Sequence, residues 1–249
     1  MTYVDEHLFV EGHYLGKPAD FTDKIVRRRI EIASKIPDFF GKNYELVDVG
    51  CGNGASMFLL ADQLKSCTGL ELFDEHQQSF EKMKAQQNAQ NCSFEIFDIE
   101  NHDYPRQFDR LICFEVIEHL EDEKNARKLY DLLKKGGKAA ISVPNKWWIF
   151  ETHGAKLPLL AWNRVPFFSW LPRPIHERFA NARIYTPERI TTLLKNVGFQ
   201  VLDYQYITAP LDVLKDGKVK EWFVKNIFRN NTTSVPFLST SVFVSVQKI

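Results

Sequence analysis

The sequence is poor in cysteine, and none of its four cysteines has the Cys-x-x-Cys spacing of zinc and redox sites. They are Cys51, Cys67, Cys92 and Cys113. Each falls on or beside a stretch whose composition is typical of a strand. We therefore expect buried free thiols in a reducing compartment, and neither a disulfide framework nor a zinc site.

Net charge and long apolar runs are also lacking. Lysine plus arginine number 32, as do aspartate plus glutamate, so the formal net charge is zero. This balance argues against a nucleic-acid partner, which usually requires a basic excess. No apolar run reaches the roughly 18 residues of a membrane-spanning helix, and residues 1–10 lack the features of a secretory signal. We expect a cytoplasmic protein without a transmembrane segment, and peripheral contact with a membrane stays open.

Strand and helix patterns alternate along most of the chain. With 249 residues, 44% of them hydrophobic, the chain can form one core, so we expect a single domain over residues 1–249. An N-terminal arm and helix occupy residues 1–43. Apolar strands are expected near 44–50, 68–73, 93–99, 109–116 and 138–143, with helices at 55–64, around Phe80 and from Ala126 to an end at Gly136-Gly137. The alternation predicts an α/β fold with a parallel sheet covered on both faces.

The last third of the chain has a different order. Thr186, Pro187 and Gly198 mark the start and end of a further helix. Two strands, near 199–207 and 240–249, follow it. The segment between them, residues 211–229, predicts an amphipathic helix on the edge of the sheet, with contact to a membrane interface as the alternative.

Three glycines at alternate positions follow the first predicted strand, in Leu46-Val-Asp-Val-Gly-Cys-Gly-Asn-Gly54-Ala55. Only glycine lets the main chain adopt positive φ and approach a ligand without a Cβ in the way. The pattern indicates a nucleotide-like ligand. Gly50-x-Gly52-x-x-Ala55 also fits the dinucleotide fingerprint, with Glu71 as its ribose-binding acid. A nicotinamide-dependent oxidoreductase therefore remains an alternative at this point.

Two acids stand at the ends of the next two strands. Glu71 ends Thr68-Gly-Leu-Glu71, and Asp98 ends Phe94-Glu-Ile-Phe-Asp98. Ligands of open α/β sheets bind at the carboxyl ends of the strands. One carboxylate can accept hydrogen bonds from both ribose hydroxyls, and the other from the exocyclic amine of adenine. With the glycine loop they predict an adenosine pocket.

In these motifs the chain resembles the class I S-adenosylmethionine-dependent methyltransferases. VDVGCGNG, TGLELF, FEIFDIE, FDRLICFEVIEHLED and LLKKGGKAAISVPN occur in that family's order, over roughly residues 22–145. The resemblance implies a Rossmann-like seven-stranded sheet with helices on both faces and an antiparallel last strand. It also implies S-adenosylmethionine as the cofactor.

By that resemblance the cofactor-binding residues are Asp48, Gly50, Gly52, Glu71, Asp98 and Phe114. The two glycines lie under the methionine part, Glu71 binds ribose, and Asp98 binds the adenine amine. Phe114 lies beside the cofactor, and Asp48 supports its amino-acid end through the glycine loop. Arg28 and Arg29 both remain candidates for the cofactor carboxylate.

The segment after the fourth strand, Phe114-Glu115-Val-Ile-Glu118-His119, brings two carboxylates and an imidazole to the expected position of the sulfonium. Methyl transfer is an in-line displacement that depends mainly on positioning, but a hydroxyl acceptor must also lose its proton. His119 is the candidate general base, and Glu118 is the second predicted catalytic residue.

The Glu-x-x-Glu-His spacing also resembles a metal-binding segment of the ubiquinone-biosynthesis O-methyltransferases and the small-RNA 2′-O-methyltransferases. That resemblance implies Glu115, Glu118 and His119 as ligands, with His176 as a fourth. Such a ligand set would suit magnesium (Mg2+) or manganese and would acidify the acceptor hydroxyl. The alternative is that no metal binds and Glu118 favours the N-terminus of the next helix.

An aromatic-rich insertion spans residues 146–185 and carries four of the five tryptophans. Its position after the fifth strand and its prolines predict a compact lid over the acceptor site. The alternative is a packed subdomain whose aromatic residues belong to the core.

The acceptor is predicted to be an oxygen of a small molecule, a glycan or a lipid-linked precursor. The fourth strand lacks the Asn/Asp-Pro-Pro-aromatic signature of many amino-group methyltransferases. Besides the oxidoreductase, one alternative from another class remains: a non-catalytic S-adenosylmethionine-binding protein whose aromatic insertion binds a partner.

Overall fold

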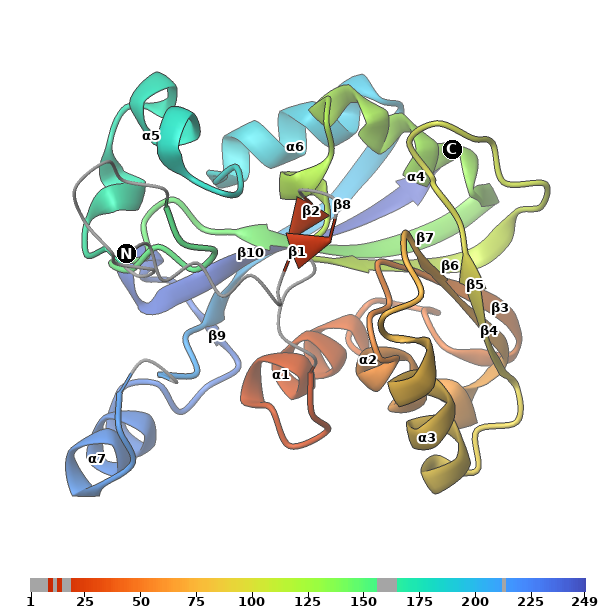
Figure 1. The fold of residues 1–249 in the computed structure, drawn as a ribbon, viewed down its shortest axis with the longest axis horizontal. Coiled ribbons are helices and arrows are strands. Elements are labelled where there is room, and N and C mark those ends of the chain that lie inside the picture. The colour runs from red at the N-terminus through yellow and green to blue at the C-terminus, as the bar shows by residue number, and fades with distance from the viewer. Residues whose placement is uncertain (1–8, 11–12, 15–18, 156–164, 212–213) are drawn as a thin grey trace.

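The computed structural model describes residues 9–10, 13–14, 19–155, 165–211 and 214–249. In these residues eight strands form one sheet in the order β5-β4-β3-β6-β7-β10-β8-β9 (Figure 1). The first five in that order are parallel: β5 (Cys92–Ile96), β4 (Leu64–Glu71), β3 (Gly41–Val49), β6 (Phe108–Phe114) and β7 (Leu133–Pro144). The others are β10 (Ser239–Lys248), β8 (Phe199–Thr208) and β9 (Thr232–Thr233).

The sheet confirms the expected fold. β10 runs antiparallel to both β7 and β8, so the last long strand is inserted beside its neighbours in the opposite direction. The sheet has eight strands where seven were expected, because the two-residue β9 pairs with the edge of β8. A separate hairpin pairs β1 (Phe9–Val10) with β2 (His13–Tyr14) in the N-terminal arm.

Helices cover both faces of the sheet. Figure 1 shows α1 (Lys24–Ala33), α2 (Ala55–Phe58) and α3 (Gln77–Gln87) on one face, with α4 (Arg127–Asp131) and α6 (Pro187–Asn196) on the other. Successive residues of a strand point to opposite faces, so Leu46 packs into the core of the first group and Val47 into that of the second. The central strands are buried on both faces, as the continuous apolar runs predicted.

Two predicted helices are shorter in the structure. The helix expected at 55–64 is the four-residue α2 followed by a 3-10 turn, Ala61–Gln63. The helix expected from Ala126 to Gly136-Gly137 is a 3-10 turn, Glu123–Ala126, followed by α4, which ends at Asp131. Leu133 already belongs to β7. Apolar side chains near these positions are buried, but a spacing that fits a helix does not fix where the helix ends.

The predicted ends of α6 are confirmed. Thr186 accepts a hydrogen bond from the Arg189 N–H at 3.3 Å, Pro187 occupies the first turn, and Gly198 follows the helix with φ +112°. The other two helices are α5 (Arg173–Phe179) and α7 (Lys218–Asn226), the second being shorter than the predicted 211–229. All four cysteines are buried and free, as expected. Among the helices that the structure describes, none has the length and apolar character needed to cross a membrane.

Arg28 is a buried structural residue of α1. Its guanidinium donates to the carbonyls of Thr208 (2.6 Å), Ala209 (2.9 Å) and Phe228. Burial lowers the pKa of Arg28, although the nearby Glu31 opposes that shift. Arg28 thereby joins α1 to the end of β8 and to the segment after α7.

Arg28→Gln should destabilise the protein. The shorter neutral side chain leaves buried carbonyls without donors, and a hydrogen bond from a charged group contributes about 1.5–3 kcal/mol. We expect the free energy of unfolding, measured by urea titration, to fall by at least ~2 kcal/mol. The neighbouring Arg27 is exposed, so Arg27→Gln should change it by less than about 0.5 kcal/mol. Equal stability of the two variants would contradict the role of Arg28.

Candidate functional site

A cavity of about 650 Å³ opens at the carboxyl ends of β3, β4 and β6. The glycine loop after β3 and the segments after β4, β5 and β6 form its walls, and residues 178–181 of the insertion add to them. Ala19, which precedes α1, also lines it. This is the place where open α/β sheets bind their ligands.

The glycine loop bends sharply between β3 and α2. Gly50 and Gly52 have φ +70° and +52°, and a Cβ on Gly50 would stand 2.3 Å from Cγ2 of Val116. Gly50 is therefore required by both its backbone conformation and its packing. The Gly52 N–H donates to Glu71 Oε2 at 2.7 Å, and the Leu72 N–H to Oε1 at 3.1 Å. The loop and the Glu71 carboxylate are held together before any ligand enters.

Asp48 in this wall is buried, and Glu71 is half-buried. Burial raises the pKa of Asp48 well above its usual value, and the nearby Glu71 raises it further. Burial also raises the pKa of Glu71, while the hydrogen bonds from Gly52 and Leu72 work in the opposite direction. Both residues line the cavity.

Asp98 lines the cavity after β5, and its oxygens are already engaged. They accept hydrogen bonds from the Glu100 N–H at 2.9 Å and from the Asn101 side chain at 2.8 Å. Burial acts to raise the pKa of Asp98, but these hydrogen bonds outweigh it and lower the pKa. The flanking Phe97 and Ile99 also line the cavity. Sequence reasoning did not single out these two apolar residues.

The structure distinguishes Arg28 from Arg29. Arg29 lines the cavity, where its Nη2 lies 2.8 Å from Glu115 Oε1 and its guanidinium lies over the Phe114 ring at 5.6 Å. The same Glu115 oxygen accepts a hydrogen bond from Ser142 Oγ at 2.9 Å. Glu115 has φ +60°, a conformation that is uncommon for residues other than glycine and is concentrated at functional sites.

Beyond this ion pair lie Glu118, His119 and His153. One ligand atom of each lies within 4.8 Å of those of the other two. His153 Nε2 is 3.5 Å from Glu118 Oε1, and the two imidazole rings meet edge to face with centroids 5.0 Å apart. Thr152 Oγ1 lies 2.9 Å from His153 Nδ1. Among the described residues, neither Glu118 oxygen accepts a hydrogen bond of ordinary geometry.

Burial decides the protonation of this cluster. It lowers the pKa of His119 to about 3, with help from His153, and that of His153 to about 4, with help from Arg29. It raises the pKa of Glu118 well above the usual value, and the neighbouring Glu115 adds to the effect. At neutral pH both imidazoles are uncharged and each has a lone pair on one nitrogen.

His176 is not part of this cluster. Its Nε2 lies 2.7 Å from Glu151 Oε2, and both side chains are fully buried. Glu151 Oε1 accepts a hydrogen bond from the His153 N–H at 3.2 Å. The ligand set expected from the sequence is therefore not the one that the structure brings together: His153 stands where His176 was expected, and Glu115 is paired with Arg29. His176 contacts the cluster only indirectly, because Glu151 lies between its imidazole and the backbone of His153.

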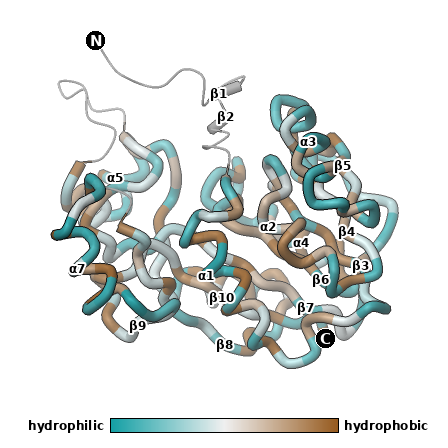
Figure 2. The backbone as a smooth tube through the Cα atoms, turned by 90° about the horizontal axis from the view of Figure 1, so that it is seen from below, coloured by the Kyte–Doolittle hydropathy of each residue, from teal (hydrophilic) through white to brown (hydrophobic). Residues whose placement is uncertain are grey.

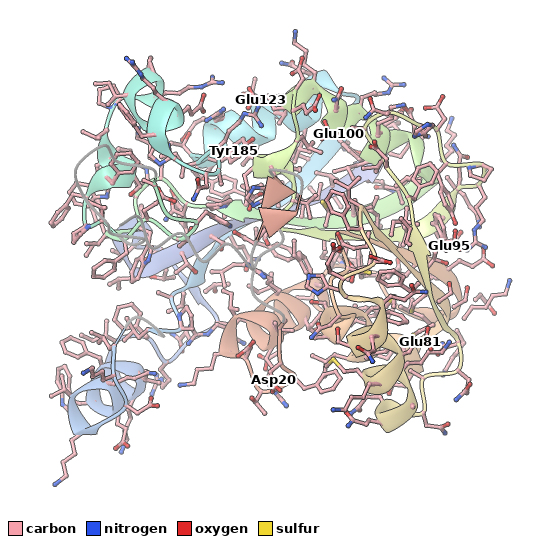
Figure 3. The ribbon with its side chains drawn as sticks, in the orientation of Figure 1. Asp20, Glu81, Glu95, Glu100, Glu123 and Tyr185 are labelled. Atoms are coloured by element: carbon pink, nitrogen blue, oxygen red, sulfur yellow. The ribbon has the colours of Figure 1, made fainter. Side chains whose placement is uncertain are left out.

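The insertion leaves the sheet and returns to it at one point. The Tyr185 N–H donates to the Pro144 carbonyl and the Lys146 N–H to the Tyr185 carbonyl, both at 2.9 Å. Tyr185 is buried, and its hydroxyl lies 3.4 Å from Glu123 Oε2 (Figure 3). The insertion is thus closed at its base.

The aromatic residues of the insertion have different surroundings. Trp148 is buried with Leu211 and Phe228, whereas Phe179 lines the cavity. Trp162 lies outside the described residues.

Comparison with known proteins identifies the family. A profile described as a methyltransferase domain matches residues 23–204. The chain belongs to the methyltransferase domain family. As a member of that family it is an S-adenosylmethionine-dependent methyltransferase, and the oxidoreductase alternative is not favoured.

Individual relatives agree with this assignment. A protein of Coxiella burnetii named ubiquinone biosynthesis O-methyltransferase is 29% identical over 189 residues, which cover 72% of this chain and 75% of that protein. An S-adenosylmethionine-dependent methyltransferase of Mesorhizobium loti has a similar structure, with a TM-score of 0.63 at 15% identity over 92% of this methyltransferase and 100% of that chain. The structure of coclaurine N-methyltransferase with SAH gives a TM-score of 0.58 at 16% identity, over 90% and 70% of the two chains. The last two likenesses show the fold alone.

His176→Ala should destabilise the insertion and displace His153. Removing one partner of a buried pair costs about 3–5 kcal/mol, so we expect the free energy of unfolding, measured by urea titration, to fall by roughly 3 kcal/mol. His102 is exposed, and His102→Ala should change it by less than about 0.5 kcal/mol. If both variants unfold at the same urea concentration, the His176–Glu151 contact does not stabilise the fold.

Proposed function

We propose that this cavity binds S-adenosylmethionine and transfers its methyl group to an oxygen of a small or lipid-linked acceptor, in a single methyltransferase domain over residues 1–249. The observation that carries the proposal is the arrangement of one continuous cavity. Acids and apolar residues suited to adenosine line it after β4 and β5, and the imidazoles of His119 and His153 also line it, with the buried carboxyl of Glu118 close to both.

The adenosine end comprises Glu71, Asp98 and Phe97. Glu71 keeps capacity to accept ribose hydroxyls, because each of its oxygens has two lone pairs and accepts only one backbone N–H. Asp98 would accept the adenine amine in the same way. Phe97 and Ile99 would pack against the adenine ring.

The methionine end comprises the glycine loop, Asp48, Arg29 and Phe114. Gly50 and Gly52 leave room for the ligand to approach the main chain. Arg29 is the arginine that we assign to the cofactor carboxylate, since Arg28 is engaged with carbonyls outside the cavity. An incoming carboxylate would compete with Glu115 for Arg29.

At the far end, Glu118, His119 and His153 would hold the acceptor hydroxyl and receive its proton. The relatives named O-methyltransferase support an oxygen acceptor. Residues 146–185 would serve as the lid, since Phe179, Ala180 and Asn181 already line the cavity. Because Phe179 gives this end an aromatic wall, phenolic hydroxyls are the first acceptors to test.

The donor set also fits a divalent cation. Two neutral imidazoles and a carboxyl within 4.8 Å suit manganese, zinc or iron better than magnesium, which prefers oxygen ligands. Glu118, His119 and His153 would hold the ion. When bound, such an ion would acidify the acceptor hydroxyl. An imidazole whose pKa is about 3 is by itself a weak proton acceptor, which favours this assistance.

Glu71→Ala should weaken the binding of S-adenosylhomocysteine. It removes an acceptor for both ribose hydroxyls, and hydrogen bonds to charged groups contribute about 1.5–3 kcal/mol each. We expect at least a tenfold rise in Kd (about 1.4 kcal/mol) by isothermal titration calorimetry.

Glu81 on α3 is the matched control, because it is exposed and is not among the residues that line the cavity (Figure 3). Glu81→Ala should bind as the wild type does. Tight binding of NAD, with none of S-adenosylhomocysteine, would overturn the cofactor assignment.

His119→Ala, His153→Ala and Glu118→Gln should each lose turnover while keeping S-adenosylhomocysteine affinity. A positioned acid or base contributes about 10²–10⁴ in rate, so we expect a loss of at least ~10². The assay is transfer of labelled methyl from S-adenosylmethionine to phenols that the wild type methylates.

Treatment with a chelator, followed by addition of manganese, zinc, iron or magnesium, tests whether turnover requires a cation. Unchanged turnover in His153→Ala would remove its role, and full activity in chelator would exclude the ion.

A further inference from the structure

Helix α7 stands apart from the body of the protein, next to β9 (Figure 1). None of its residues is buried. It is anchored by Phe223 and Val224, which pack against the cluster of Trp148, Leu211 and Phe228. The neighbouring face carries Val219, which is 69% exposed, and Trp222, which is 57% exposed. Core packing does not account for the exposed aromatic side chain of Trp222 in the middle of a short helix.

The charge around this apolar face is basic. Residues 214–229 contain four lysines and one arginine against two acids, in a chain whose formal net charge is zero. One of the acids, Asp216, is paired with Lys220 at 2.8 Å. Lys218 and Lys225 are exposed beside the apolar face. The segment therefore combines exposed tryptophan with an excess of lysine.

A second apolar patch lies at the same end of the molecule. Phe167, Trp170 and Phe237 are 54%, 38% and 44% exposed. Their rings form a continuous group, with centroids 4.9 Å apart between Phe167 and Trp170 and 5.4 Å apart between Trp170 and Phe237. Figures 1 and 2, which differ by a quarter turn, both show α5 and α7 at this end.

We propose that this end of the protein docks on an anionic lipid surface. Aromatic and aliphatic side chains enter the interface of a bilayer, while lysines beside them meet anionic headgroups. Charge complementarity favours this occupant over a second copy of the chain, because two copies of a basic segment would repel each other. The proposal does not depend on the acceptor assigned above.

Docking in this orientation brings the insertion to the membrane. The insertion presents Phe167 and Trp170 at the docking surface, and its residues 178–181 line the cavity. One segment of the chain therefore lies between the lipid surface and the acceptor end of the cavity. This arrangement suits an acceptor that is drawn from the lipid phase.

The test is flotation of the purified full chain with phosphatidylcholine vesicles, with and without phosphatidylglycerol. We expect binding to the anionic vesicles that weakens as salt rises, and little binding to the neutral ones. Val219→Ser with Trp222→Ser should reduce the bound fraction about tenfold, and so should Lys218→Gln with Lys225→Gln. Quenching of tryptophan fluorescence by brominated lipid should be smaller in Trp222→Phe than in the wild type.

Leu202 provides the matched control. It is 40% exposed on β8, away from Tyr206 and Ile207, which pair with β9. Leu202→Ser should float as the wild type does. Absence of binding to anionic vesicles, or equal binding by the α7 variants, would overturn the proposal. A dimer seen by light scattering without lipid, and lost in Trp222→Ser, would instead assign the face to a second copy.

Discussion

The hydrogen bond from the Gly52 N–H to Glu71 Oε2, at 2.7 Å, is the contact on which the rest of the site depends. It joins the loop after β3 to the end of β4, and the Gly50 N–H adds a second link to the Leu70 carbonyl at 2.8 Å. A bulkier residue at Gly50 would meet Val116, which leads directly into Glu118 and His119. The glycine loop thus fixes both the adenosine end of the cavity and the segment that carries the acidic and imidazole groups. The side chains around the loop are closely packed, so a shift of the loop would displace them as well.

The sequence allowed the fold to be predicted, and several residues that line the cavity to be named, because their signals are local. Apolar runs, three glycines and acids at successive strand ends each refer to a few neighbouring residues, and parallel strands bring such ends together in any open α/β sheet. The cap and stop of α6 are local for the same reason. The ends of α2 and α4 were not predictable in this way, since burial on the sheet rather than helical spacing decides where those segments turn.

The acceptor end depends on contacts that no short motif encodes. His153 and His176 both belong to the insertion, and only its packing puts one beside Glu118 and the other against Glu151. Arg28 and Arg29 are adjacent in sequence, yet the rotation of about 100° per residue in a helix sends one to the end of β8 and the other into the cavity. The sequence named both arginines as candidates without deciding between them, and it named His176 but not His153.

Arg28 and Arg29 also contact two distant parts of the molecule. Arg28 donates a hydrogen bond to the Phe228 carbonyl just after α7, whereas Arg29 forms an ion pair with Glu115 in the cavity. Both side chains project from the same turn of one helix, so a rotation of α1 about its axis moves the two contacts together. One turn of α1 therefore contacts both the wall of the cavity and the segment that follows α7, a helix with no buried residue.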